Sequence, residues 1–292
     1  MNFKDKKFLE NLINKYSEKN SNNITYPLID DVFSIADIYK GIEVLLSKQL
    51  SMSEITKEFE YEFAKYVGTK YALMVNSGSS ANLLAAFALV NPRKKNFLRQ
   101  GCEFLIPVLC WPTSLWPLVQ AGLKPRFVDV DVNNFNLDMD ELKKKLNNKI
   151  KVIMAVHVLG NSTHIEEIAK IAKSRNIFLI EDTCESLGAK YKNKYLGTFG
   201  DFGTYSFYYS HQMTSGEGGM IVCNSKKDYE LIFSMRSHGW SRRLKVKDTS
   251  FNFINSGFNL RPLEVSAAIG LNQFKRLNSM IKSRIGNREK II

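Results

Sequence analysis

The sequence has 292 residues, of which 44% are hydrophobic and 24% are charged, and its formal net charge at pH 7 is +12. This composition is ordinary for a soluble globular protein. No stretch approaches the roughly 18 uninterrupted apolar residues of a membrane helix, and the N-terminus is too charged for a signal peptide. We therefore expect a cytoplasmic protein without a membrane partner.

Strand-like and helical segments alternate along most of the chain. After a polar, partly helical extension at 1–25, strand-like apolar runs occur at 71–76, 104–109, 126–130, 151–158, 177–181, 204–209 and 220–223. Helical patterns occur at 32–48, 53–67, 80–90, 113–121, 139–146, 165–175, 228–237 and 263–285. This alternation predicts an α/β fold with a mainly parallel sheet covered by helices on both faces.

The basic residues and the cysteines narrow the class of protein further. The basic runs at 93–95 and 242–247 are not interleaved with aromatic residues and accompany no nucleic-acid-binding motif, so nucleic acid is not expected as a partner. We expect most of this charge to be solvated surface. A basic chain also suits a substrate that carries several phosphates. The cysteines lack CxxC and CxxH spacing, which argues against a disulfide framework or a zinc site. They are Cys102, Cys110, Cys184 and Cys223.

Two segments place polar residues at the ends of predicted strands. In NSGSSAN (76–82), Gly78 permits a tight turn, and the amides and hydroxyls at the start of the next helix suit a phosphate. A plain serine N-cap is the competing interpretation. In IFLIED (177–182), Asp182 lies at the edge where open α/β sheets bind ligands and could keep a heteroaromatic nitrogen protonated. A helix cap is the simpler alternative for Asp182.

The third segment is GDFGTYSFYYSHQMTSGEGGM (200–220). In it a short predicted strand ends just before the pair Ser210 and His211. Histidine moves protons near neutral pH, although a lone loop histidine is more often structural. Together the three segments resemble the DegT/DnrJ/EryC1/StrS sugar aminotransferase family of fold-type-I pyridoxal-phosphate (PLP) enzymes. The resemblance also includes IEDTCESLGAKYKNKYLGTFGDFG and GFNLRPLEVSAAIGLNQFKRL and runs from about residue 26 to the C-terminus.

The resemblance implies an aspartate-aminotransferase-like fold and a domain organisation. Residues 26–262 would form the PLP-binding large domain, preceded by the polar extension 1–25. Residues 263–292 would begin a linker helix to a small C-terminal domain that is mostly absent. The last helical pattern runs to the end of the sequence without a cap or a following element, so we expect an incomplete chain.

The position of the family's catalytic lysine predicts the type of reaction. In such enzymes a lysine after the SFYP-like strand binds the cofactor as a Schiff base. Here that position is His211, and no lysine lies between Lys194 and Lys226. A histidine can move protons but cannot capture the aldehyde. The segment resembles a lysine-to-histidine branch, the 3-dehydratases, which remove the C3 hydroxyl from nucleotide-linked 4-keto-6-deoxy sugars.

One kind of 3-dehydratase carries an iron–sulfur cluster on cysteine ligands. Cys184 matches the first ligand, but two further ligand positions are Arg242 and Leu244 here, and no cysteine follows Cys223. No iron–sulfur cluster or other metal is therefore expected. The other kind uses L-glutamate, and MRSHGWSRRL and EDTCES resemble its members that act on GDP-linked 4-keto-6-deoxymannose. The sequence does not distinguish GDP from CDP or another nucleotide.

The cofactor-binding residues that the resemblance implies are Gly78, Ser79, Ser80, Trp111, Asp182, Ser206, Ser210 and Asn259. Gly78, Ser79 and Ser206 are expected to hold the phosphate, and Asp182 to pair with the ring nitrogen. Trp111 is expected to stack on the ring, although an apolar residue there could instead belong to the core.

Further roles concern the sugar and a second subunit. Ser210 is expected to hydrogen-bond the cofactor near His211, and Asn259 to reach the phosphate of a neighbouring subunit, which implies a homodimer with a shared site. The expected substrate-binding residues are Glu185, Glu217, His238 and Arg261. Surface or turn roles are equally open for the two glutamates.

The implied reaction has two halves. L-Glutamate converts PLP to pyridoxamine phosphate (PMP), and the amine then condenses with the C4 ketone of the sugar. His211 removes a proton from C4′ of the cofactor, the C3 hydroxyl leaves, and hydrolysis releases a 3-deoxy sugar and ammonia. Two alternatives stay open: a nucleotide-sugar 4-aminotransferase that uses another lysine, and a catalytically inactive relative that acts as a binding protein.

Overall fold

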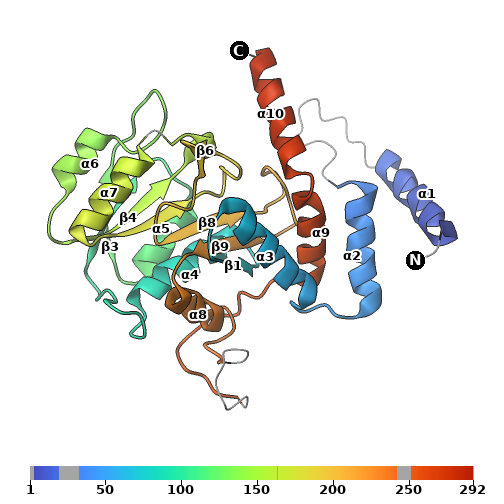
Figure 1. The fold of residues 1–292 in the computed structure, drawn as a ribbon, viewed down its shortest axis with the longest axis horizontal. Coiled ribbons are helices and arrows are strands. Elements are labelled where there is room, and N and C mark those ends of the chain that lie inside the picture. The colour runs from blue at the N-terminus through green and yellow to red at the C-terminus, as the bar shows by residue number, and fades with distance from the viewer. Residues whose placement is uncertain (1–2, 20–32, 163, 242–250, 292) are drawn as a thin grey trace.

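The computed structural model describes residues 3–19, 33–162, 164–241 and 251–291. Within them a seven-stranded sheet is flanked by helices, and helices from both ends of the chain lie together at one side of it (Figure 1). The basic run at 242–247, with Arg242 and Leu244, and part of the N-terminal extension lie outside the described residues.

The sheet has the strand order β1-β9-β8-β5-β4-β2-β3. Within it, β9 runs antiparallel to its neighbours β1 and β8, and the other neighbouring pairs are parallel. The predicted mainly parallel α/β sheet is therefore confirmed. The strand bounds are β1 (Tyr71–Val75), β2 (Glu103–Pro107), β3 (Lys124–Val128), β4 (Ile150–Val156), β5 (Phe178–Asp182), β8 (Phe202–Ser206) and β9 (Gly219–Cys223).

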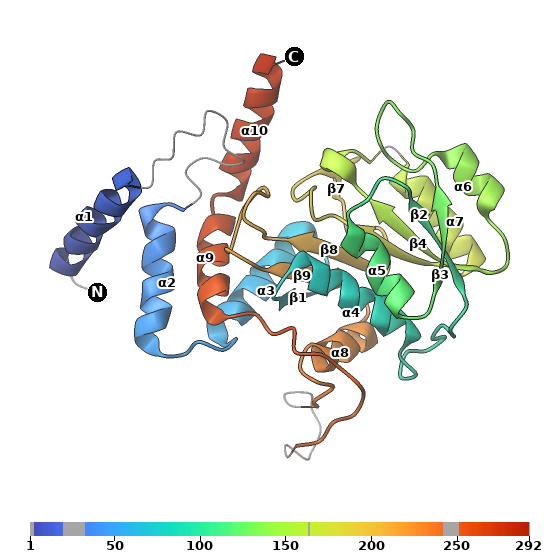
Figure 2. The ribbon, with the colours of Figure 1, turned by 180° about the vertical axis from the view of Figure 1, so that it is seen from behind.

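Helices cover both faces of this sheet. α4, α5 and α8 pack on one face, and α3, α6, α7 and α9 pack on the other (Figures 1 and 2). None of the described helices is long and apolar enough to cross a membrane. The helix bounds are α1 (Phe3–Lys19), α2 (Ile35–Ser47), α3 (Glu54–Val67), α4 (Gly78–Val90), α5 (Pro112–Gln120), α6 (Met139–Lys145), α7 (Ile165–Arg175), α8 (Lys226–Met235), α9 (Glu264–Phe274) and α10 (Leu277–Ile291).

Alternation of side chains along the strands divides the core between the two faces. Leu73 and Val75 of β1 pack in the cluster with α4, whereas Met74 between them packs with α3 and α9. In β4, Met154 packs in the cluster with α4, whereas Ile153 packs in the cluster with α6 and α7. Both faces of each central strand are buried, which explains why these strands read as continuous apolar runs.

The strand directions bring the predicted functional segments to one edge of the sheet. β1, β2, β4, β5 and β8 run in one direction, so the residues that follow each of them emerge at the same edge. The loop before β9 returns to this edge because β9 runs the other way. Open α/β sheets bind ligands at this position.

Two segments differ from the predicted elements. The helical pattern at 263–285 is two helices, α9 and α10, separated near Arg276. Arg276 makes an ion pair at 2.5 Å with the buried carboxylate of Asp37 in α2, which anchors the break against that helix. In addition, β6 (Lys190–Tyr191) and β7 (Lys194–Tyr195) form a hairpin that was not predicted. Its turn residues, Lys192 and Asn193, have φ values of 45° and 67°.

A buried carboxylate joins the start of α9 to the start of α3. Glu264 accepts hydrogen bonds from the amides of Ser53 at 2.5 Å and Ile55 at 2.7 Å, and from the Thr56 hydroxyl at 2.6 Å. Ser53 precedes α3 without a side-chain cap of its own. Glu264 therefore caps α3 from a distant part of the chain, where a negative charge also favours the helix dipole.

Candidate active site

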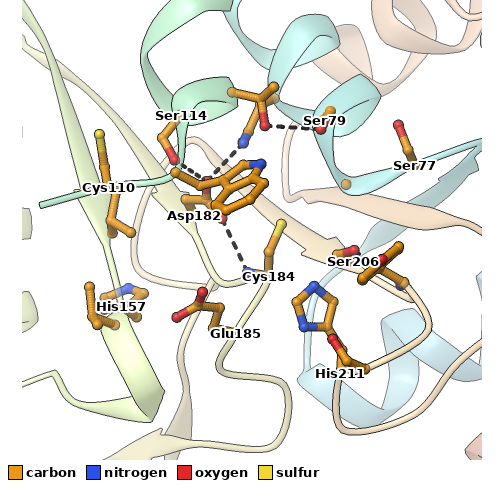
Figure 3. Close-up of a pocket in the computed structure, with 18 of the residues that line it drawn as sticks. Ser77, Ser79, Cys110, Ser114, His157, Asp182, Cys184, Glu185, Ser206 and His211 are labelled. Atoms are coloured by element: carbon orange, nitrogen blue, oxygen red, sulfur yellow. Dashed lines mark hydrogen bonds between the residues drawn. The ribbon is translucent and has the colours of Figure 1, made fainter. Parts of the chain in front are cut away.

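A cavity of about 790 Å³ opens at the edge where the parallel strands end. Figure 3 shows Asp182 and Ser114 on one side of it and Ser206 and His211 on the other. The cavity brings together most of the residues for which the sequence predicted a role. They are Gly78, Ser79, Trp111, Asp182, Glu185, Ser206, Ser210, His211 and Glu217.

The turn between β1 and α4 contains a helix cap and also lines the cavity. The Ser77 hydroxyl accepts the Ser80 amide at 3.1 Å, so the N-cap interpretation holds for this serine. The Ser79 hydroxyl instead points across to α5, 2.9 Å from Thr113 Oγ1. The first amides of α4 lie at the positive end of the helix and suit an anionic group beside Ser79.

Gly78 lets this turn approach the end of β8. A Cβ atom at this position would lie 2.6 Å from Cβ of Ser206 and 2.8 Å from Sγ of Cys184. Any larger residue would therefore push the helix away from the strand. The close approach places the Ser206 hydroxyl and the α4 amides around the same space, as a phosphate site requires.

Asp182 ends β5 as a buried carboxylate that is 5% exposed. Its Oδ2 accepts hydrogen bonds from Asn82 Nδ2 at 2.8 Å and Ser114 Oγ at 2.7 Å, and its Oδ1 accepts the Cys184 amide at 3.1 Å. The Thr204 hydroxyl donates to Asn82 Oδ1 at 2.7 Å, which fixes the orientation of that amide. The carboxylate is thus positioned by α4, α5 and β8 rather than by a local cap alone.

His211 lies in the loop that leads from β8 to β9. Its ring meets the ring of Tyr208 edge-on, with 5.9 Å between centroids. Burial lowers the pKa of His211; Asp182 opposes this shift, and the positive charge of Arg284 adds to it. The imidazole is therefore neutral at pH 7, which is the form that accepts a proton.

His157 and Glu181 form a buried pair beside the cavity that the sequence analysis did not assign to the site. His157 lines the cavity after β4, with its Nε2 3.0 Å from Glu181 Oε2. The fully buried Glu181 also accepts the amides of Gly197, Phe199 and Gly200 at 2.6–2.8 Å. This network fixes the loop at 197–200 and the histidine ring together.

Two thiols also line the cavity. Burial raises the pKa of Cys184 well above its usual range, and the nearby Asp182 carboxylate raises it further. Burial and the same carboxylate raise the pKa of Cys110. Both thiols therefore stay protonated at neutral pH. In the part of the chain that the structure describes, no group of three or more histidine, cysteine or acidic residues could hold a metal ion.

Four of the predicted residues do not line this cavity: Ser80, His238, Asn259 and Arg261. The Ser80 hydroxyl accepts a hydrogen bond from the Ser77 hydroxyl at 3.0 Å inside the first turn of α4. His238 and Asn259 are exposed, and Arg261 is half-buried. The contact of Asn259 with a second subunit and the sugar contacts of His238 and Arg261 stay predictions.

Comparison with known proteins identifies the class to which this arrangement belongs. Residues 36–291 match the model of the DegT/DnrJ/EryC1/StrS aminotransferase family. The chain therefore belongs to this family of PLP enzymes, and the resemblance noted in the sequence is confirmed.

Individual relatives agree with this assignment. The chain is 43% identical to the GDP-4-keto-6-deoxy-D-mannose 3-dehydratase of Escherichia coli O55:H7, over 91% of this chain and 71% of the relative. A solved structure of the E. coli GDP-4-keto-6-deoxy-D-mannose-3-dehydratase with bound hydrated PLP has a TM-score of 0.87 and 42% identity, covering 91% of this chain and 71% of that chain. Another solved GDP-4-keto-6-deoxymannose-3-dehydratase, with a trapped PLP-glutamate geminal diamine, has a TM-score of 0.83 and 42% identity, covering 87% and 69%.

The residues present fit PLP. The absence of a Cβ atom at Gly78 lets the start of α4 lie against Ser206, so that backbone amides and a hydroxyl suited to a phosphate lie close together. A buried carboxylate, Asp182, faces the cavity at the position suited to a pyridine nitrogen. His211 follows β8 in a loop that lines the cavity, and its match to the family's lysine position stays a prediction.

Proposed function

We propose that this chain is a PLP- and PMP-dependent 3-dehydratase that removes the C3 hydroxyl of a nucleotide-linked 4-keto-6-deoxy sugar, with L-glutamate as the amino donor. The observation that carries the proposal is His211, which lines the cavity together with Asp182. No lysine is found among the described residues that line this cavity. The named 3-dehydratases among the relatives, at 42–43% identity, support the same substrate class.

Non-covalent contacts would hold the cofactor in the absence of a lysine. Gly78, Ser79 and Ser206 would bind its phosphate, Asp182 its ring nitrogen, and Trp111 the face of its ring. When bound, the cofactor supplies the electron sink for the reaction. The hydrogen bonds to Asp182 fix its carboxylate before the reaction starts, so little reorganisation is needed there.

His211 would move the protons of the reaction. Its lowered pKa keeps the imidazole neutral at pH 7, so it can accept a proton from C4′ of the cofactor. Once protonated, it can donate a proton to the C3 hydroxyl as that group leaves. Ser210, its neighbour in the cavity lining, would hydrogen-bond the cofactor beside it. Glu185 and Glu217, which are exposed at the same cavity, would contact the sugar.

The proposal includes a homodimer with a shared active site. Trp111 is 67% exposed and Tyr208 45% exposed, although both line the cavity, so this side of the site is open for a second copy. Asn259, His238 and Arg261 would then act across the interface. Sedimentation velocity of the full chain tests the assembly. The division into an extension at 1–25, a large domain at 26–262 and a linker segment at 263–292 is part of the same proposal.

Mass spectrometry of the sugar product tests the function. The protein is mixed with PLP, L-glutamate and GDP-4-keto-6-deoxymannose. The dehydratase gives a sugar that has lost one oxygen atom, with one ammonia and one 2-oxoglutarate released for each glutamate consumed. A sugar that carries nitrogen at C4 would instead show an aminotransferase. PLP uptake is measured by the absorbance of the bound cofactor. A protein that does not take up PLP would be an inactive relative.

Replacement of His211 gives a first prediction. His211→Asn should lower the rate of dehydration by about a hundredfold or more, because a positioned acid–base group contributes roughly 10²–10⁴ in rate. PLP uptake should persist, since the phosphate and ring contacts are unchanged. His164→Asn is the matched control, because His164 lies before α7 and outside this cavity. Full activity of the His211→Asn variant would refute the assignment.

A further inference from the structure

The loop that carries His211 is anchored to α9 at its far side. The Thr214 amide donates to Gln273 Oε1 at 3.0 Å, and Met213 is buried in the core cluster that α3 and α9 share. The Thr214 hydroxyl and the Ser215 amide both bond the Phe207 carbonyl at 3.0 Å. These contacts close the base of the loop but do not involve His211.

A second anchor comes from α10 and acts at His211 itself. Arg284 Nη2 donates to the main-chain carbonyl of His211 at 2.8 Å. α10 is held in place one and two turns earlier: Asn278 Oδ1 accepts the Tyr66 hydroxyl at 3.0 Å, and Ile281 packs against the core cluster of α3 and α9. Ile281 and Arg284 are three residues apart and so share a face of the helix. The helix therefore presents this arginine to the loop.

We propose that Arg284 is a positioning residue for His211. Arg284 holds the His211 carbonyl and keeps a fixed positive charge beside the imidazole. The catalytic meaning of this contact rests on the function proposed above. Arg284 does not line the described cavity and touches neither the coenzyme site nor Asp182, so its effect passes through His211.

The charges around His211 explain what this arginine does. The titratable groups that line the cavity with His211 are Cys110, His157, Asp182, Cys184, Glu185, Tyr208 and Glu217, and Arg284 contacts its main chain from outside the cavity. Asp182 raises the pKa of His211 and Arg284 lowers it, while burial lowers it most. Arg284 is thus the cation whose charge opposes the effect of the Asp182 carboxylate on His211. Without it, more of the imidazole is protonated at neutral pH, and the protonated form cannot accept a proton.

The experiment compares three variants of the full chain. Arg284→Met removes the charge and the hydrogen bond but keeps an unbranched stem, and Arg284→Lys keeps the charge. Arg288→Met is the matched control, because Arg288 lies one turn further along the exposed part of α10. Thermal unfolding of each variant establishes that it folds.

Histidine NMR titration gives a readout that does not depend on activity. The sequence has four histidines, and the His211→Asn variant identifies the His211 signal. The pKa of His211 should rise in Arg284→Met and stay near the parent value in Arg284→Lys and Arg288→Met. An unchanged His211 pKa in a folded Arg284→Met protein overturns the proposal, whether or not the parent protein is a dehydratase.

Steady-state kinetics then test the positioning. In Arg284→Met, the acid limb of the kcat profile should move to higher pH, and kcat at neutral pH should fall by about tenfold with little change in KM, because misplaced groups lose rate rather than binding. Arg284→Lys should keep the acid limb of the parent. If the parent dehydrates the sugar and the limb of Arg284→Met does not move, Arg284 is not a positioning residue.

Discussion

The two sides of the cavity differ in how their key residues are held. Asp182 is buried at the end of a central strand, and three hydrogen bonds from α4, α5 and its own loop fix its carboxylate. His211 is half-buried on a loop, and its described anchors come from α10 and from that loop. The Asp182 side is therefore held within the sheet, whereas the His211 side depends on α10 and on its own loop.

This contrast gives an order of sensitivity to substitution. A change on the Asp182 side disturbs a closed hydrogen-bond network and costs both stability and activity. A change among the exposed side chains at the mouth of the cavity leaves the fold intact and affects only what binds there.

The largest effect is expected for Asp182→Asn. The new amide would place an N–H group against the donors from Asn82 and Ser114 or against the Cys184 amide, and a neutral side chain no longer favours a protonated ring nitrogen. Activity should fall on the order of a thousandfold, within the range for loss of an acid–base group. Turnover at saturating sugar measures this. The exposed Asp129→Asn is the control, and near-parent turnover in Asp182→Asn would contradict the assigned role.

An intermediate effect is expected for Ser114→Ala. Ser114 is fully buried and donates one of the two hydrogen bonds that Asp182 Oδ2 accepts. Its loss should lower the free energy of unfolding by about 1–3 kcal/mol, and turnover should fall less than in Asp182→Asn because Asn82 still holds the carboxylate. Urea denaturation measures the free energy of unfolding. Ser174→Ala on the exposed surface of α7 is the matched control, and equal stabilities of the two variants would show that the buried hydrogen bond to Asp182 adds no stability.

The smallest effect on the fold is expected for Glu217→Gln at the mouth of the cavity. Glu217 is exposed, so the free energy of unfolding should change by less than about 0.5 kcal/mol. The KM for the nucleotide sugar should rise a few-fold if this carboxylate contacts the sugar. An unchanged KM together with unchanged stability would place Glu217 outside the binding site.

The sequence predicted the sheet and the residues at its edge because local patterns determine them. The apolar runs that became β1, β2, β4 and β5 are bounded by polar residues, and Asp182 follows such a run directly. Asn82 could have been noticed as a polar residue inside the apolar helix GSSANLLAAFALV. Asp182, which Asn82 contacts, lies 100 residues further along the chain, and no local pattern predicts such a contact.

Other features depend on tertiary contacts that a single sequence does not display. His157 gains its place in the site from Glu181 on the neighbouring strand, so only the order of the sheet reveals it. The break between α9 and α10 depends on Asp37 of α2, which pairs with Arg276. The predicted role of Asn259 depends on a second copy of the chain.

The cap that Glu264 places on α3 has a consequence for the order of folding during translation. Its partner Thr56 lies 208 residues earlier in the chain, and β1, the first of the described strands, finds its sheet partner only in β9. Closing such long loops is slow. Until the ribosome has released α9, the core cluster that Met74 shares with α3 lacks the side chains that α9 contributes. Among the described elements, α3 and β1 thus wait longest for their partners, and the apolar surface exposed during that time favours binding by a chaperone.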